Sequence, residues 1–284
     1  MRARVLYLIA AAVIAAVWLA NYGYYRYYRL PEAGFLRHYI ETTYTPSVAF
    51  DLLYVANKDD KRKPVSASAG GLEALQFYPV QVHQELRRQT IYVMRGYFDE
   101  NRMLERPERE PLRLSELTVR YSDGSERVED VGEIIVSLPA WPPDTSKEAP
   151  VQMSSVTGSS RHEGSAIVSA TRPVTLTGVS SAWLERLGDS FQYEIKTFPE
   201  QGAPYPKSAA YPLELKEGQT LMLEYRYRLP ETGDALSVYR LQLRERFEEP
   251  DGETYDYVVF ANYTPYPTDA QMRAYVREKR GRGE

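Results

Sequence analysis

The run Val5–Ala20 (VLYLIAAAVIAAVWLA) contains sixteen consecutive residues without a charged side chain. As an α-helix it would rise about 24 Å, less than the ~30 Å hydrocarbon core of a bilayer, and extending the helix through Tyr25 brings its length to about 31 Å. After residue 30 the chain is polar, and its apolar residues alternate as they do in half-buried strands. The sequence therefore predicts one transmembrane helix followed by β-structure.

The apolar run has three possible interpretations. A cleaved signal peptide needs small residues at positions −3 and −1, but Trp18 and Asn21 occupy position −3 of the two candidate sites, before Ala20 and Gly23. A buried core helix directly after Met-Arg-Ala-Arg is uncommon in a soluble protein. We therefore expect an uncleaved signal anchor that contacts the lipid bilayer through residues 5–25.

The far end of this helix is rich in aromatic residues. Tyr and Trp settle at the headgroup level because the ring is apolar and its edge can hydrogen-bond to water, and arginine can extend its charge to the same level. The predicted membrane-interface residues are Trp18, Tyr22, Tyr24, Tyr25 and Arg26.

The orientation of the helix is predicted from charge and from domain size. Arg2, Arg4 and the terminal amine favour a cytoplasmic N-terminus, whereas Arg26, Arg29 and Arg37 oppose it. A large domain after a short N-terminal anchor is normally exported. We expect a single-pass protein of the cell membrane with its N-terminus inside and residues 30–284 outside the cytoplasm.

Composition narrows the class of protein. The formal net charge is −4, which gives no general case for nucleic-acid binding. The absence of cysteine excludes disulfides and thiolate catalysis, and an exported chain without disulfides suits a bacterial cell envelope. The 24 tyrosines favour strands.

Strands are predicted from alternation near residues 48–54, 74–86, 89–98, 117–121, 126–138, 151–157, 164–170, 173–179, 190–198, 220–229, 239–244 and 255–261. Asp123-Gly124 predicts a two-residue type I′ hairpin turn. The last three strands are predicted to form an antiparallel meander.

The remaining segments are predicted as helices or loops. Phe35, Leu36, Tyr39 and Ile40 could form one face of a short helix ended by Pro46, and residues 57–71 are expected to be a solvated loop. A basic C-terminal helix is predicted from the capping-box pair Thr268 and Gln271 and from the apolar stripe Met272, Tyr275 and Val276.

The predicted fold class is mainly β: a transmembrane helix followed by antiparallel β-sandwich domains of immunoglobulin-like type, two in tandem. One continuous sandwich is the alternative. The predicted segments are the anchor at 1–29, a juxtamembrane segment at 30–46, a first sandwich at 47–140, a Pro-rich linker at 141–150, a second sandwich at 151–266 and the basic helix at 267–284.

No catalytic or metal-binding motif emerges from the sequence. His38, His83 and His162 lack paired metal-ligand spacing, and neither a G-x-S-x-G elbow nor a P-loop is present. We therefore assign no catalytic residue, metal or cofactor.

Five arginines form the candidate binding site. In the predicted meander, Arg226 and Arg228 occupy the outward positions of one strand, and Arg240, Arg244 and Arg246 occupy those of the next. Guanidinium groups bind phosphate or carboxylate in bidentate fashion. Cross-strand ion pairs with Glu194, Glu224 and Asp256 are the structural alternative.

These observations favour a non-enzymatic, membrane-anchored binding or scaffold protein of the bacterial envelope. Its expected partner is another envelope protein or an anionic envelope polymer. Two alternatives remain: an anchored hydrolase whose site is assembled from scattered Asp, Glu and His, and an accessory subunit of a membrane complex.

Overall fold

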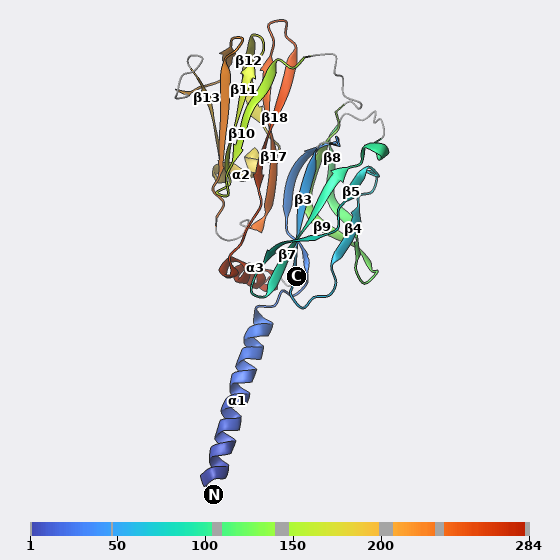
Figure 1. The fold of residues 1–284 in the computed structure, drawn as a ribbon, viewed down its shortest axis with the longest axis vertical. Helices are drawn as coiled ribbons and strands as arrows, with labels where there is room; N and C mark the ends of the chain where they lie inside the picture. The colour runs from blue at the N-terminus through green and yellow to red at the C-terminus, as the bar shows by residue number, and fades with distance from the viewer. Residues whose placement is uncertain are drawn as a thin grey trace.

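The computed structural model describes residues 2–46, 48–103, 110–139, 148–198, 207–230 and 236–281. Strands make up 51% and helices 19% of the structure, so the prediction of a mainly β protein with an N-terminal apolar helix is confirmed. The helix α1 (Arg2–Tyr27) extends away from the β-rich part, which lies beyond its C-terminal end (Figure 1).

An eight-stranded sheet runs through the whole β-rich part. The order of seven of its strands is β15 (Leu213–Leu215), β12 (Val174–Ser180), β17 (Val238–Glu248), β2 (His38–Thr43), β9 (Glu126–Ser137), β8 (Leu112–Tyr121) and β4 (Pro64–Ser68). The eighth, β18 (Thr254–Tyr263), pairs with β17. Both contacts of β2 are parallel, to β17 on one side and to β9 on the other, and β2 thereby joins the early and late parts of the chain in one sheet.

Two five-stranded sheets cover this central sheet. The first has the order β1 (Gly34–Phe35), β3 (Ala49–Asn57), β7 (Gln89–Phe98) and β5 (Leu75–Phe77), and β6 (Gln81–Glu85) also pairs with β7. The second has the order β10 (Val151–Gly158), β11 (Glu163–Ala170), β16 (Thr220–Tyr227), β13 (Phe191–Thr197) and β14 (Lys207–Ser208). The short helices are α2 (Leu184–Leu187), η1 (Glu100–Arg102) and η2 (Gly188–Ser190).

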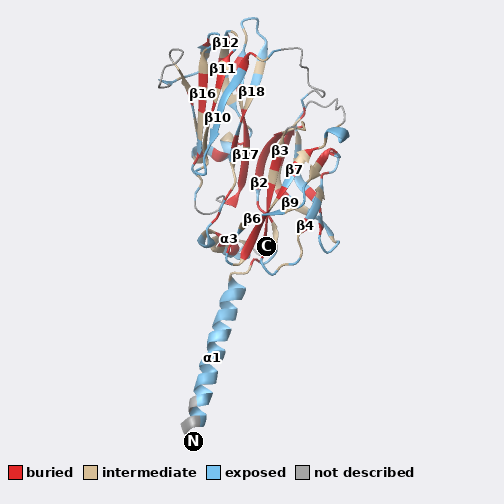
Figure 2. Cartoon of the chain, in the orientation of Figure 1, coloured by how far each residue is buried: buried red, intermediate tan, exposed pale blue. Residues whose placement is uncertain are grey.

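Three apolar clusters form the core, and burial is concentrated between the sheets (Figure 2). One lies between β3 and β7 and the early strands of the central sheet, and a second lies between the other five-stranded sheet and β12, β17 and β18. The third lies on the opposite face of β3 and β7, where Leu53, Val55 and Ile91 contact the cluster that includes Met272 and Val276. β3 is therefore apolar on both faces, because the sheet that contains it is covered on both sides.

The third cluster includes the C-terminal helix α3 (Asp269–Gly281). The backbone N–H of Thr268 donates to Gln271 Oε1 at 2.9 Å, and the N–H of Gln271 donates to Thr268 Oγ1 at 3.3 Å. These two bonds are the predicted capping box. The predicted apolar stripe is also confirmed, since Met272 and Val276 are buried and Tyr275 packs against the same cluster.

The predicted helix within residues 31–46 is wrong. This segment forms β1 and β2 instead, and five of the six residues of β2 are buried. A strand buried on both faces has no alternation of apolar and polar residues, so the same apolar spacing fits one face of a helix. This segment thus contributes β1 to the first five-stranded sheet and β2 to the central sheet.

The predicted meander is also corrected. β16 pairs with β11 and β13 in one sheet, whereas β17 belongs to the central sheet and pairs with β18, β12 and β2. Only the β17–β18 hairpin of the predicted meander exists. The turn predicted at residues 230–234 lies, from residue 231 on, outside the described residues.

Smaller differences concern loops and turns. The predicted loop at 57–71 contains β4, and the strand predicted at 74–86 is divided into β5 and β6. The hairpin of β8 and β9 is present, but within the described residues only Gly124 of its turn has a positive φ (+83°), so the turn is not of type I′.

Most of the Pro-rich segment predicted as a domain boundary, residues 140–147, lies outside the described residues. The division into two tandem immunoglobulin-like domains remains a prediction, because the layers on both sides of that segment share the central sheet.

Candidate functional site at the junction of α1 and the β-rich part

The apolar helix α1 is exposed along its described residues. Its segment Tyr7–Tyr27 is long and apolar enough to cross a membrane, and none of its most apolar stretch is buried. This exposure excludes the interpretation of the run as a core helix. The predicted interface residues Trp18, Tyr22, Tyr24, Tyr25 and Arg26 are all exposed on this helix, and their contact with a bilayer remains a prediction.

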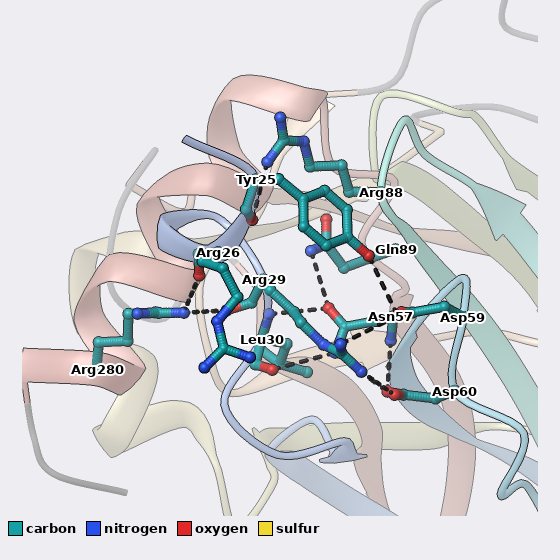
Figure 3. Close-up of polar contacts among 10 residues, drawn as sticks. All are labelled: Tyr25, Arg26, Arg29, Leu30, Asn57, Asp59, Asp60, Arg88, Gln89 and Arg280. Atoms are coloured by element: carbon teal, nitrogen blue, oxygen red, sulfur yellow. Dashed lines mark hydrogen bonds and ion pairs between the residues drawn. The ribbon is translucent and has the colours of Figure 1, made fainter. Parts of the chain in front are cut away.

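The C-terminal end of α1 is bound by side chains of the β-rich part (Figure 3). The last carbonyl groups of a helix have no partner within the helix itself. Arg88 Nη1, from the turn between β6 and β7, donates to the carbonyl oxygens of Tyr24 and Tyr25 at 3.0 and 3.1 Å. Its guanidinium carbon also lies 4.7 Å from the ring centroid of Tyr24 and 5.8 Å from that of Tyr28. A cation at this end also opposes the negative pole of the helix dipole.

Two further side chains bind carbonyls at this end. Gln89 Nε2 donates to the carbonyl of Tyr28 at 3.0 Å. Arg280 Nη2, from α3, donates to the carbonyls of Arg26 and, at 2.9 Å, Arg29. The same end of α1 is therefore bound by the first five-stranded sheet and by the C-terminal helix.

Asn57, at the end of β3, binds both backbone polar groups of Leu30, which follows the end of α1. Its Oδ1 accepts the backbone N–H of Leu30 at 2.8 Å, and its Nδ2 donates to the Leu30 carbonyl at 3.1 Å. Asn57 is itself oriented by Asp60, whose Oδ2 accepts the Asn57 backbone N–H at 2.9 Å. We call the four side chains Asn57, Arg88, Gln89 and Arg280 the helix clamp.

Charged pairs surround the helix clamp. Arg29 lies 3.0 Å from both Asp59 Oδ2 and Asp60 Oδ1, and Tyr25 donates its hydroxyl to Asp59 at 3.1 Å. Burial lowers the pKa of Arg29, but the hydrogen bond to Asp60 and the charges of both aspartates outweigh this and raise it. Arg29 therefore stays protonated and bound to this loop.

Comparisons with known proteins assign no function to this site. No protein-family model matches the chain, and no curated protein matches it. One similar solved structure is a crystal structure of a protein of unknown function from Porphyromonas gingivalis W83, with 14% sequence identity and a TM-score of 0.23, covering 83% of this chain and 97% of that chain.

The five arginines predicted to share one sheet face are divided between two sheets. Arg226 is exposed on β16 and pairs with Glu163 at 2.8 Å, and the exposed Arg228 follows the same strand. Arg226 lines a hollow of about 740 Å³ that also contains Glu163, Glu194 and Glu224. The ion-pair alternative therefore describes the surroundings of Arg226.

The other three arginines lie on β17. Arg240 is bound to the carbonyl of Ala49 and lies 4.8 Å from the ring centroid of Phe260, and burial lowers its pKa to about 10. Arg244 donates to Ser137 and Gln242, and Arg246 pairs with Asp256 at 3.0 Å. The ladder of five arginines does not exist as one surface, and a binding role for its members remains a prediction.

The three histidines lie in three different sheets or their turns. His38 on β2 is fully buried; its Nε2 accepts the Leu53 N–H at 2.8 Å, so its Nδ1 donates to the Val131 carbonyl at 2.8 Å. Burial lowers its pKa to about 4 and keeps it neutral. The rings of His83 and His162 pack on tyrosines. Within the described part of the chain, no three His, Asp or Glu residues are grouped so that they could hold a metal ion.

Sequence analysis missed the helix clamp. Asn57, Asp59 and Asp60 were assigned to a solvated loop, and Arg88 and Gln89 to the turn between two predicted strands. The four side chains of the helix clamp bind backbone carbonyls between 27 and 254 residues away in sequence, and a carbonyl leaves no signal in a sequence. The one available indication was the set of unpartnered carbonyls at the end of any long helix.

Replacing Arg88 with alanine should loosen the junction. The variant loses two charge-assisted hydrogen bonds to α1 and the contacts with the tyrosine rings, so the local free energy of opening should fall by about 1–2 kcal/mol. Amide hydrogen exchange at residues 28–30 should then become roughly tenfold faster. Arg87→Ala is the matched control: this neighbouring arginine is exposed, and among the described residues its hydrogen bond is made by its backbone N–H, to Asp269. Equal exchange rates in the two variants would show that Arg88 does not hold the helix.

Proposed function

We propose that this protein is a single-pass, membrane-anchored, non-enzymatic binding or scaffold protein of the bacterial cell envelope, with its β-rich part outside the cytoplasm. The observation that carries the proposal is the combination of an unburied apolar helix with a clamp on its last carbonyls. The role of the anchor is to hold the β-rich part in one pose at the membrane surface.

The helix clamp supports a fixed orientation of the β-rich part at the end of α1. Arg88, Gln89 and Arg280 all donate to backbone carbonyls of residues 24–29. These residues follow both candidate cleavage sites, so the argument for a retained helix is the presence of Trp18 and Asn21 at position −3. A binding surface held in this way is presented at a fixed height and orientation, which suits a scaffold that meets partners in the same envelope.

Single-cysteine labelling tests the location and orientation, because the chain contains no cysteine of its own. Ser155→Cys places a thiol at an exposed position of β10, and Ala3→Cys places one before the apolar stretch. In intact spheroplasts a membrane-impermeant maleimide should label the first variant at once and the second only after permeabilisation. The reverse pattern would overturn the orientation, and labelling of both after release by alkaline carbonate would overturn the anchor.

The binding role has a separate test. Purification of the full chain from its native membrane in mild detergent should return it with an envelope protein or an anionic envelope polymer. Recovery of the chain alone after covalent cross-linking in the intact membrane would contradict a scaffold role while leaving the anchor in place.

A further inference from the structure

A hollow of about 540 Å³ lies beside the helix clamp, between the end of α1, the segment that follows it and α3. Among the charged residues that line it, five are basic and two are acidic, a net of three positive charges. They are Arg26, Arg29, Lys61, Arg62 and Arg280, with Glu32 and Asp60. Figure 3 shows that Arg26, Arg29 and Arg280 meet around the backbone at the end of α1.

Part of this positive charge is compensated within the protein. Arg29 pairs with Asp59 and Asp60, and Arg62 lies 3.8 Å from Glu32. Arg26 and Lys61 are both exposed, and among the described residues no hydrogen bond or ion pair holds either side chain. These two cations are available to an anion that enters the hollow.

Insertion of α1 in a membrane would place the hollow at the depth of the lipid phosphates. Arg26 belongs to the last turn of α1, within the segment Tyr7–Tyr27 that is long enough to span a membrane. Exposed tyrosines on the same turn are the residue type that settles at the headgroup level. A phospholipid beside this turn can lay its acyl chains along the apolar face of α1 while its phosphate reaches the basic side chains.

We propose that this hollow is a binding site for the phosphate group of an anionic phospholipid, with Arg26 and Lys61 as its principal ligands. The proposal rests on the proposed function, because only an inserted α1 brings lipid to the hollow. Bound lipid adds an anion beside the helix clamp and fixes the β-rich part against the membrane surface. The pairs of Arg29 with Asp59 and Asp60 keep that arginine in place whether or not lipid is bound.

The test uses the full chain in nanodiscs of phosphatidylcholine that contain a minor fraction of phosphatidylglycerol. Native mass spectrometry measures how much phosphatidylglycerol stays bound after the disc is removed. The wild-type chain should retain it in preference to phosphatidylcholine, and the double variant Arg26→Gln/Lys61→Gln should lose roughly tenfold of that preference, because two uncompensated charges are removed.

A matched variant separates a site from general charge attraction. Arg273→Gln/Arg277→Gln removes two basic residues of α3 that do not line the hollow, and it should retain phosphatidylglycerol as the wild type does. Equal loss in the two double variants, or no preference in the wild type, would overturn the site. Displacement of the lipid by inorganic phosphate would assign the hollow to free phosphate instead. Each of these outcomes leaves the anchor intact, whereas failure of α1 to insert into the disc removes the proposed function itself.

Discussion

Replacing Glu245 with glutamine should stabilise the folded protein at neutral pH by about 3 kcal/mol. Glu245 lies on β17 between Leu243 and Phe247, and its side chain faces the same apolar cluster. Only 1% of the residue is exposed, and its Oε2 has no hydrogen-bond partner among the described residues. Burial therefore raises the pKa of this carboxyl group from 4.5 to about 8.

The direction of the pH dependence follows from this shift. Between pH 4.5 and about pH 8 the folded protein holds the proton of Glu245, whereas the unfolded chain has released it. The contribution of protonated Glu245 to the free energy of unfolding is therefore fully present below pH 4.5 and is lost as the pH rises toward 8. A glutamine carries no proton to lose, so the gain over the wild type should be near zero at pH 4 and about 5 kcal/mol at pH 9.

Denaturant unfolding of the full chain in detergent, followed by near-UV circular dichroism at several pH values, measures this gain. Glu248→Gln is the matched control, because Glu248 lies on the same strand but is exposed. The control should change stability by no more than about 0.5 kcal/mol. A difference between Glu245→Gln and the wild type that stays constant from pH 4 to pH 9 would contradict a buried, protonated Glu245.

The positions of many strands in the late part of the sequence were predictable from the local pattern of apolar and polar residues. The strands predicted near 151–157, 164–170, 173–179 and 190–198 correspond to β10, β11, β12 and β13. β11, β12 and β13 each have one face against the second core, so their side chains alternate in polarity, whereas the edge strand β10 is exposed after Val151. The capping box of α3 was predictable for a similar reason, since both of its partners lie within one helical turn.

Pairing between strands was not predictable in the same way. Alternation shows which face of β16 is buried. It does not show whether β16 lies beside β17 in the same sheet, as in a meander, or in the facing sheet of a sandwich. The structure has the second arrangement, and this separates Arg226 from Arg240 by a whole core layer. A candidate site built from side chains on two strands therefore depends on a pairing that alternation leaves open.

The strand β2 shows the other limit. Its parallel partners, β9 and β17, begin 88 and 200 residues after its first residue, and no turn signal links it to either. It nevertheless joins the two ends of the central sheet, and Glu41 at its centre accepts the backbone N–H of Gln242 at 2.9 Å. Residues 38–43, which the sequence places in a short juxtamembrane segment, thus form the strand that connects the early and late parts of the central sheet.

The pairing of β2 with β9 brings the two backbones very close together at Gly132. Gly132 lies opposite His38 in the parallel pairing of β2 and β9, and its φ is +96°. A Cβ atom at this position would lie 2.3 Å from the carbonyl oxygen and 2.5 Å from the backbone nitrogen of His38. The ring of His38 is held by hydrogen bonds to Val131 and Leu53, and its backbone is held by parallel pairing with both β9 and β17, so a shift of the backbone would disturb these contacts.

We expect Gly132→Ala to destabilise the protein by about 3 kcal/mol or more, because the substitution adds both an unfavourable φ and a clash between backbone atoms. Gly124→Ala carries the first contribution alone: Gly124 also has a positive φ (+83°), but no atom lies within 4 Å of its added Cβ, and the cost there should be about 1 kcal/mol. Denaturant midpoints of both variants measure the difference. If they lose the same stability, the close approach of β2 to β9 does not limit position 132; if only Gly132→Ala is severely destabilised, the contact between β2 and β9 is what holds the early and late parts of the sheet together.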